Sequence, residues 1–152
     1  MNRRVLSSQG SGLIEVVVAS ALLLTVFVGL FTVLQLSTKL ATDNKAHTGA
    51  TALAVERMEY IRSLDYSVVG VVGGDPQGVL EATENITLNT VAYTRDTTIV
   101  YVDDEKDGLG GSDVNGISND YKRVKVEVSW QSPSGTRSST IVSDIAGLQI
   151  EQ

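Results

Sequence analysis

Cysteine is absent from this chain of 152 residues. Its absence excludes disulfides, cysteine-based metal sites, thiol catalysis and lipid attachment through an N-terminal cysteine. Histidine occurs once, at His47, with no nucleophile or carboxylate at an evident catalytic spacing. The G-x-S-x-G, H-E-x-x-H and phosphate-loop motifs are missing as well. We therefore expect a protein that is not an enzyme.

Basic residues are outnumbered. The chain has 12 Lys and Arg against 18 Asp and Glu, a formal net charge of −6. Non-specific binding to nucleic acid depends on Lys and Arg that neutralise phosphates. We therefore expect no nucleic-acid partner, and the small basic patch at Arg123 and Lys125 can act only locally.

Charge is almost missing from the 22 residues between Leu13 and Leu34, where Glu15 is the only ionisable side chain. As an α-helix this run reaches about 33 Å, enough to cross a hydrocarbon core of about 30 Å. The single A-x-A-like triplet, Ala19-Ser20-Ala21, lies inside the run, so a conventional cleaved signal peptide fits poorly. An intramembrane charge costs several kcal/mol unless it is partnered, which marks Glu15 as a candidate functional residue.

The helix is expected to continue beyond the apolar run. Between Ser37 and Leu64 there is no proline, and Gly49 is the only glycine. Apolar residues recur there at spacings of three and four, the pattern of an amphipathic helix, at Ala50, Leu53, Ala54, Met58, Ile61 and Leu64. Glu59 and Arg62 lie mainly on the other side and are spaced to pair at i,i+3.

A short motif precedes the apolar run, namely Gly10 followed by Ser11-Gly12-Leu13-Ile14-Glu15. It resembles the class III signal of type IV pilins and of the pseudopilins of type II secretion. The resemblance implies that a prepilin peptidase cleaves between Gly10 and Ser11, and that Ser11 becomes the N-methylated first residue. Glu15 is then the fifth mature residue. The family most often has phenylalanine where this chain has Ser11. The segment 53–66 resembles the helix end of minor pilins of the PilV type.

The role that the resemblance implies for Glu15 agrees with its chemistry. Cleavage releases a cationic amino group at Ser11, within one helical turn of Glu15 or beside the Glu15 of a neighbouring subunit. That ion pair would set the register between subunits. The expected function is that of a structural, minor pilin subunit. It would be held in the inner (cytoplasmic) membrane with its head outside the cytoplasm, then assembled with other pilin subunits by the pilus assembly platform. Two alternatives stay open: a type II secretion pseudopilin, and an uncleaved, signal-anchored extracytoplasmic binding domain.

Turn and strand signals dominate after the helix. Glycines cluster with Asp75-Pro76 between Val69 and Gly78, and β-rich runs follow. We expect strands at 78–82, 85–88, 91–102, 121–130 and 136–145, with Val124, Val126, Val128 and Trp130 on one face. The predicted fold is α+β, a long N-terminal helix packed on a small antiparallel sheet. It divides into a leader (1–10), a transmembrane or filament-core half-helix (11–37), an amphipathic half-helix (38–66) and a β-rich head (67–152).

The segment from Asp103 to Asp120 holds six acidic residues against one lysine. Asp103, Glu105 and Asp107 have the opening spacing of a calcium loop, and Asp113 begins a partial repeat. Val114 stands where an EF-hand needs a bidentate glutamate, so an EF-hand is excluded. An irregular Ca²⁺ site is one hypothesis for these four residues, and a solvated hairpin loop is the other.

Overall fold

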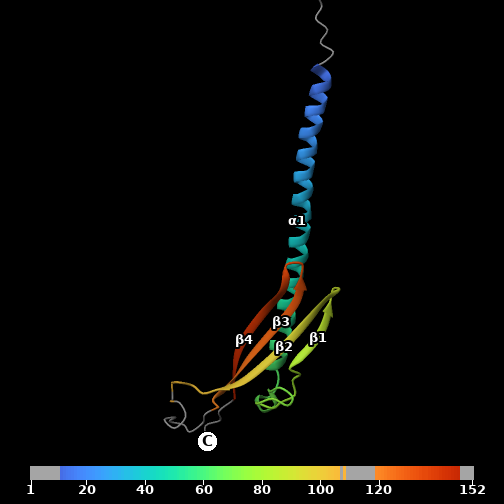
Figure 1. The fold of residues 1–152 in the computed structure, drawn as a ribbon. Coiled ribbons are helices and arrows are strands. Elements are labelled where there is room, and N and C mark those ends of the chain that lie inside the picture. The colour runs from blue at the N-terminus through green and yellow to red at the C-terminus, as the bar shows by residue number, and fades with distance from the viewer. Residues whose placement is uncertain (1–10, 107, 109–118, 148–152) are drawn as a thin grey trace, which may run out of the picture. The chain divides into compact units, whose positions relative to one another are not determined.

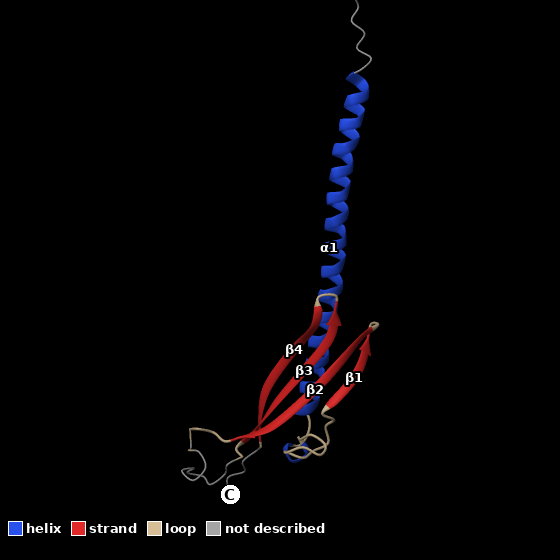
Figure 2. Cartoon of the chain, viewed as in Figure 1, coloured by secondary structure: helices blue, strands red, loops and turns tan. Residues whose placement is uncertain are grey.

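The computed structural model describes residues 11–106, 108 and 119–147. Along the chain it has helix α1 (Ser11–Arg62), a 3-10 turn η1 (Tyr66–Val68) and four strands (Figures 1 and 2). The strands are β1 (Thr83–Leu88), β2 (Val91–Val102), β3 (Tyr121–Ser132) and β4 (Gly135–Ala146). The predicted α+β fold, one long N-terminal helix with an antiparallel sheet, is confirmed. The chain divides into two compact units, one ending at Thr42 and the other beginning at Asp43.

The second unit is built by the C-terminal part of α1 and the sheet. Small and apolar side chains of α1 meet the apolar face of β2 and β3 in one core: Ala46, Ala50, Leu53, Ala54, Met58, Ile61, Val69, Leu80, Tyr93, Ile99, Val124, Val126, Val128 and Trp130. The stripe predicted for the helix is therefore confirmed, and Leu64 packs against the core just beyond the helix end. The predicted pair forms too, with Arg62 Nη1 lying 2.8 Å from Glu59 Oε1.

The sheet is a simple antiparallel meander in the order β1-β2-β3-β4. Asn89 and Thr90 form the β1–β2 turn with φ values of 50° and 68°, the left-handed pair that a tight two-residue hairpin requires. Pro133 and Ser134 make the β3–β4 turn, between the two strands predicted at 121–130 and 136–145. The alternation predicted for β3 is confirmed, because its three even-numbered valines and Trp130 are all buried.

One predicted strand is wrong. Residues 78–82 do not form a strand; they belong to a folded loop that makes isolated bridges to Val71. In this loop the amide of Val72 donates to the Leu80 carbonyl at 2.8 Å, and the amide of Leu80 donates to the Gly70 carbonyl at 3.0 Å. Gly78 approaches the Gly70 backbone so closely that a Cβ would not fit. Tertiary packing around buried Leu80 therefore overrides local strand propensity.

Candidate functional site

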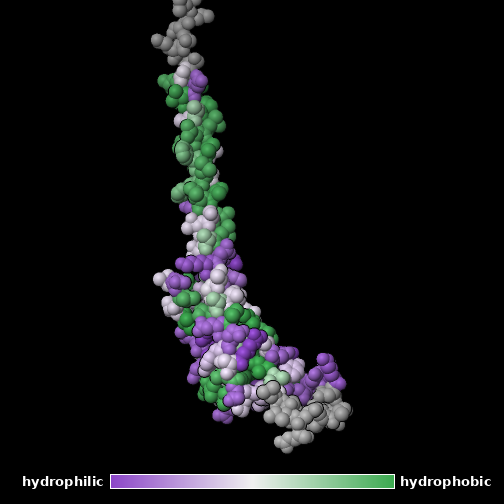
Figure 3. All heavy atoms as spheres, turned by 180° about the vertical axis from the view of Figure 1, so that it is seen from behind, coloured by the Kyte–Doolittle hydropathy of each residue, from purple (hydrophilic) through white to green (hydrophobic). Residues whose placement is uncertain are grey.

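The first unit presents an apolar surface. Every large apolar side chain from Leu13 to Leu40 is exposed in the chain by itself, and Figure 3 shows this part of the helix as a nearly continuous hydrophobic surface. Within the described residues, α1 is the one helix that has the length and apolar composition to cross a membrane. These properties are compatible with a single-pass membrane anchor.

Hydroxyl groups inside this apolar span are satisfied by the helix itself. Ser20, Thr25 and Thr32 are the hydroxyl residues between Leu13 and Leu34, and each donates to a backbone carbonyl one turn earlier at 2.9 Å. A hydroxyl bonded in this way needs no water and no neighbouring chain. The span therefore presents almost no unmet polar group to its surroundings.

Glu15 is the exception. It lies in the second turn of α1 with its side chain exposed, and it has no hydrogen bond or ion pair among the described residues. Ser11 is the first residue of α1, whereas Gly10 lies outside the described residues. Along a helix, Ser11 and Glu15 are separated by about 6 Å of rise, one turn apart. A cation at the start of this helix, from the same chain or from a neighbour, is the partner that Glu15 can accept.

A contrasting carboxylate lies in the second unit. Glu84 Oε2 on β1 is 3.0 Å from Arg57 Nη2 on α1 and 3.0 Å from Arg95 Nη2 on β2. Both arginines are buried; Arg57 also donates to the Glu81 carbonyl and Arg95 to the Leu53 carbonyl. Burial lowers the pKa of Arg57, and the charge of Glu84 opposes that shift. The cluster ties α1 to the edge of the sheet.

Sequence reasoning missed this cluster, although a signal for it was present. Arg95 has the same strand parity as Tyr93, Thr97 and Ile99, all of which are buried. Lys122 likewise shares the parity of Val124 on β3 and is buried. A charge at an inward position of a strand predicts a buried partner.

Lys122 fastens the loop after α1 to β3. Its Nζ donates to the carbonyls of Tyr66 and Val69 at 2.8 and 2.6 Å and lies 4.5 Å from the centroid of the Tyr66 ring. Burial lowers the pKa of Lys122. Its partners are neutral, so the lysine acts as a structural clamp.

The calcium hypothesis stays a prediction. Asp103 and Glu105 are described, whereas Asp107 and Asp113 lie outside the described residues. In the part of the chain that the structure describes, no group of three or more His, Cys, Asp or Glu side chains is placed to hold a metal ion. The amide of Asp104 donates to Asp120 Oδ2 at 2.7 Å, which joins the two ends of the segment.

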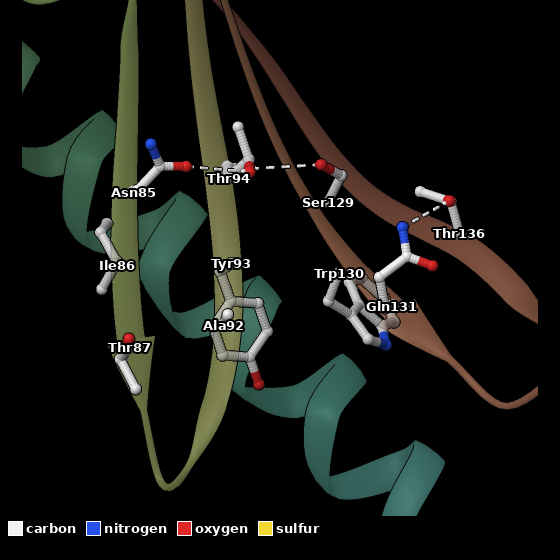
Figure 4. Close-up of a pocket in the computed structure, with 10 residues that line it drawn as sticks. All are labelled: Asn85, Ile86, Thr87, Ala92, Tyr93, Thr94, Ser129, Trp130, Gln131 and Thr136. Carbon is white, nitrogen blue, oxygen red and sulfur yellow. Dashed lines mark hydrogen bonds between the residues drawn. The ribbon is translucent and has the colours of Figure 1, made fainter.

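A shallow pocket of about 350 Å³ lies on the face of the sheet away from α1 (Figure 4). Its rim carries hydroxyl and amide groups, and it has no charged lining residue. Thr94 Oγ1 donates to Asn85 Oδ1 at 3.2 Å, and Gln131 Nε2 donates to Thr136 Oγ1 at 3.0 Å. These groups largely satisfy one another. His47, the single histidine, lies elsewhere, edge-on to Trp130 with ring centroids 5.8 Å apart.

Comparison with known proteins gives no relative: no protein-family model, no curated protein and no solved structure matches this chain. The layout, an apolar N-terminal helix whose later turns pack on a four-stranded antiparallel sheet, is pilin-like.

Proposed function

We propose that this protein is a structural subunit of the pilin type, a minor pilin, that assembles through the N-terminal part of α1 into a type IV pilus-like filament. The observation that carries the proposal is the placement of Glu15. It is the only charge in the exposed apolar run from Leu13 to Leu34, one turn after the first helical residue and five residues after Gly10. In this proposal a prepilin peptidase removes residues 1–10 and Ser11 becomes the N-methylated terminus.

The exposed apolar surface supports assembly. A contiguous apolar surface of this extent is not stable in water and indicates a membrane or protein partner. Lipid would surround residues 11–37 before assembly, with the head outside the cytoplasm, and the same residues of other subunits would surround them afterwards. Because the three hydroxyls between Leu13 and Leu34 bond to the backbone of their own helix, both environments suit that stretch equally in hydrogen bonding.

Glu15 supplies the specificity that apolar packing lacks. Apolar helices slide along one another at little cost, whereas a carboxylate in an apolar environment strongly favours the one register that gives it a cation. The amino group freed at Ser11 is such a cation. In a filament, Glu15 of one subunit and Ser11 of its neighbour would form the pair.

The first experiment determines the N-terminal residue and intact mass of the membrane-extracted protein, with and without an active prepilin peptidase. A chain that begins at Ser11 only with the peptidase supports the proposal, and added methyl mass on Ser11 supports N-methylation. Gly10→Val should block cleavage, whereas the matched change Gly12→Val should permit it.

A chain that begins at Met1 in both samples overturns the proposal and favours the uncleaved, signal-anchored binding domain. Cleavage at Gly10 followed by function in secretion rather than in surface filaments would favour a type II secretion pseudopilin. Electron microscopy of sheared surface material distinguishes these last two outcomes.

A further inference from the structure

We propose that the heads of adjacent subunits join edge to edge, with β4 of one copy pairing antiparallel with β1 of the next to form a continuous sheet. The proposal rests on the proposed function, because it names a second copy of this chain as the partner. It concerns a surface far in sequence from Glu15 and the apolar span.

Within the described residues, no strand pairs with the outer side of either edge of the sheet. β1 and β4 are the outer strands of the meander, and each has its ladder on one side only. Neither strand makes any backbone hydrogen bond to the remaining described residues. A strand edge with free N–H and C=O groups is a template for another strand.

Neither edge strand has a proline, a lysine or a bulge, three of the features that block strand addition. The charged residues at the edges, Glu84 on β1 and Arg137 and Asp144 on β4, are each ion-paired within the chain. The β3–β4 register runs without a bulge from Tyr121↔Ala146 to Ser132↔Gly135, and β4 contains no proline and no lysine. β1 is likewise regular over its six residues and lacks both residue types. Edge strands are normally protected by prolines, lysines or bulges.

The inward-facing apolar side chains at both edges are only partly covered. Ile86 and Leu88 on β1, and Ile141 and Ile145 on β4, pack against the core but remain half-buried. A further strand on each edge would cover the side that is still open. Among the described residues the two edges therefore lack backbone partners on their outer side, and their apolar side chains are only partly covered, so one added strand would supply both kinds of contact.

Strand direction selects the second copy and its orientation. In a four-stranded antiparallel meander, β1 and β4 run in opposite directions, so β4 of one copy and β1 of an equally oriented copy pair antiparallel. Antiparallel β4–β4 pairing would reverse one helix, and parallel β4–β4 pairing would place the two helices on opposite faces of the sheet. Only β4–β1 pairing leaves every helix in the same direction on the same face. Such a head-to-tail contact does not close on two copies and can extend along a filament.

The absence of cysteine makes a direct test available. Thr87→Cys on β1 is combined in turn with a cysteine on the outward face of β4, at Thr136, Ser138, Thr140 or Val142. Within one copy the two edges are about 14 Å apart, too far for a disulfide. Oxidation of the full chain in membranes or filaments should give a ladder of dimers, trimers and larger species for at least one combination. The two single variants expressed together should give dimers only.

The matched control places the second cysteine at Val100, which faces the same side from the central strand β2. A ladder absent from every β4 combination, or equally strong with Val100→Cys, overturns edge pairing. In a combination that gives a ladder without altering Val142, Val142→Lys should remove most of it and Val100→Lys should not. These valines are 55% and 44% exposed, so the two lysines are similarly accommodated.

The outcomes separate this inference from the proposed function. Filaments that form without an edge ladder overturn the pairing and leave the filament proposal intact. A ladder from chains that still begin at Met1 upholds the pairing and overturns the proposed processing and assembly.

Discussion

The two parts of α1 have the same backbone conformation and opposite surroundings. From Leu13 to Leu40 the large apolar side chains are exposed all round the helix, whereas from Ala46 to Ile61 one stripe of small and apolar side chains is buried against the sheet. The two carboxylates described above differ in the same sense: Glu15 has no partner among the described residues, and Glu84 has two buried arginines. One part of α1 is packed within the chain, and the other presents an apolar surface that is compatible with a single-pass membrane anchor.

The largest effect is expected from removing the carboxylate of Glu15. We expect Glu15→Ala and Glu15→Gln to abolish filament assembly, because register between apolar helices is then no longer enforced. Cleavage after Gly10 should persist. The measurements are electron microscopy of sheared filaments and the N-terminal residue of the membrane protein. Normal filaments from Glu15→Gln would show that the carboxylate has no role in register.

Removing the buried carboxylate of Glu84 should lower the stability of the head and should have no direct effect on assembly. Glu84→Gln leaves two buried arginines without their carboxylate, so we expect a loss of about 3–5 kcal/mol in the free energy of unfolding. The control is Glu59→Gln, which breaks the exposed pair with Arg62 and should cost less than about 1 kcal/mol. Denaturant unfolding of the detergent-solubilised chain, followed by the fluorescence of buried Trp130, measures both. Equal effects would show that burial of the cluster is unimportant.

A charge introduced into the first part of α1 should impair membrane insertion, whereas the same charge in the second part should not. Val26→Arg, at a side chain 60% exposed, should disfavour membrane insertion by about 2.5–3.5 kcal/mol. Val55→Arg, at a side chain 45% exposed on the second part, should leave insertion unchanged. Partition between membrane and soluble fractions reports the result. Retention of Val26→Arg in the membrane at the normal level would contradict a spanning helix.

Two glycines in α1 should respond to alanine with opposite signs. A Cβ at Gly49 would lie 2.6 Å from the Tyr93 hydroxyl oxygen, which donates to the Ala46 carbonyl. Gly49→Ala should therefore destabilise the head by about 1–3 kcal/mol. A Cβ at Gly29 meets nothing within 4 Å in the chain, so Gly29→Ala should favour the helix by about 0.5–1 kcal/mol.

Thermal unfolding of the head measures Gly49→Ala, and helix content in detergent measures Gly29→Ala. A Gly29→Ala variant that keeps its helix but fails to assemble would place a neighbouring subunit against Gly29. Unchanged head stability in Gly49→Ala would contradict the close approach of Tyr93 to the helix.

The smallest expected effect is a pH dependence from Lys122. Because burial lowers its pKa in the folded chain, the unfolded chain binds more protons between that lowered value and 10.5, and stability should rise with pH in this window. The slope is at most about 1.4 kcal/mol per pH unit. Lys122→Met should flatten it, and Lys125→Met on the open face of β3 should not.

Burial raises the pKa values of Tyr66 and Tyr93. Above about pH 10 these two tyrosines therefore lower the stability as the pH rises, opposite to the effect of Lys122. Urea midpoints compared between pH 8 and pH 10 therefore isolate the lysine. A slope that survives in Lys122→Met would assign it to another group.

Periodicity predicted the parts of the fold in which burial follows a regular pattern. The stripe through Ala50 and Ile61 and the alternation through Val124 and Trp130 need only the helical and strand repeats. The loop around Gly78 was predicted wrongly because its conformation depends on close contacts with Gly70 and on the burial of Leu80. Local sequence carries little information on such contacts.

Of the charged groups described above, one could be predicted from the sequence and the others could not. Glu15 stands out from sequence alone because a charge in an apolar run is rare. The Arg57–Glu84–Arg95 cluster does not, because its members come from a helix and two strands whose register had to be known first. The inward parity of Arg95 and Lys122 is a signal that sequence reasoning missed, and only the fold identifies their partners.

The hydroxyls of Ser20, Thr25 and Thr32 have a further consequence. Their hydrogen bonds travel with the helix, so a subunit that leaves the bilayer neither loses nor gains a bond at these positions. These three hydrogen bonds therefore contribute nothing to the free-energy difference between the helix in lipid and the helix among other subunits. If the protein assembles as we propose, a filament subunit would enter and leave the membrane without a change in these hydrogen bonds, and the ion pair of Glu15 would be the one polar contact of the apolar span that has to break.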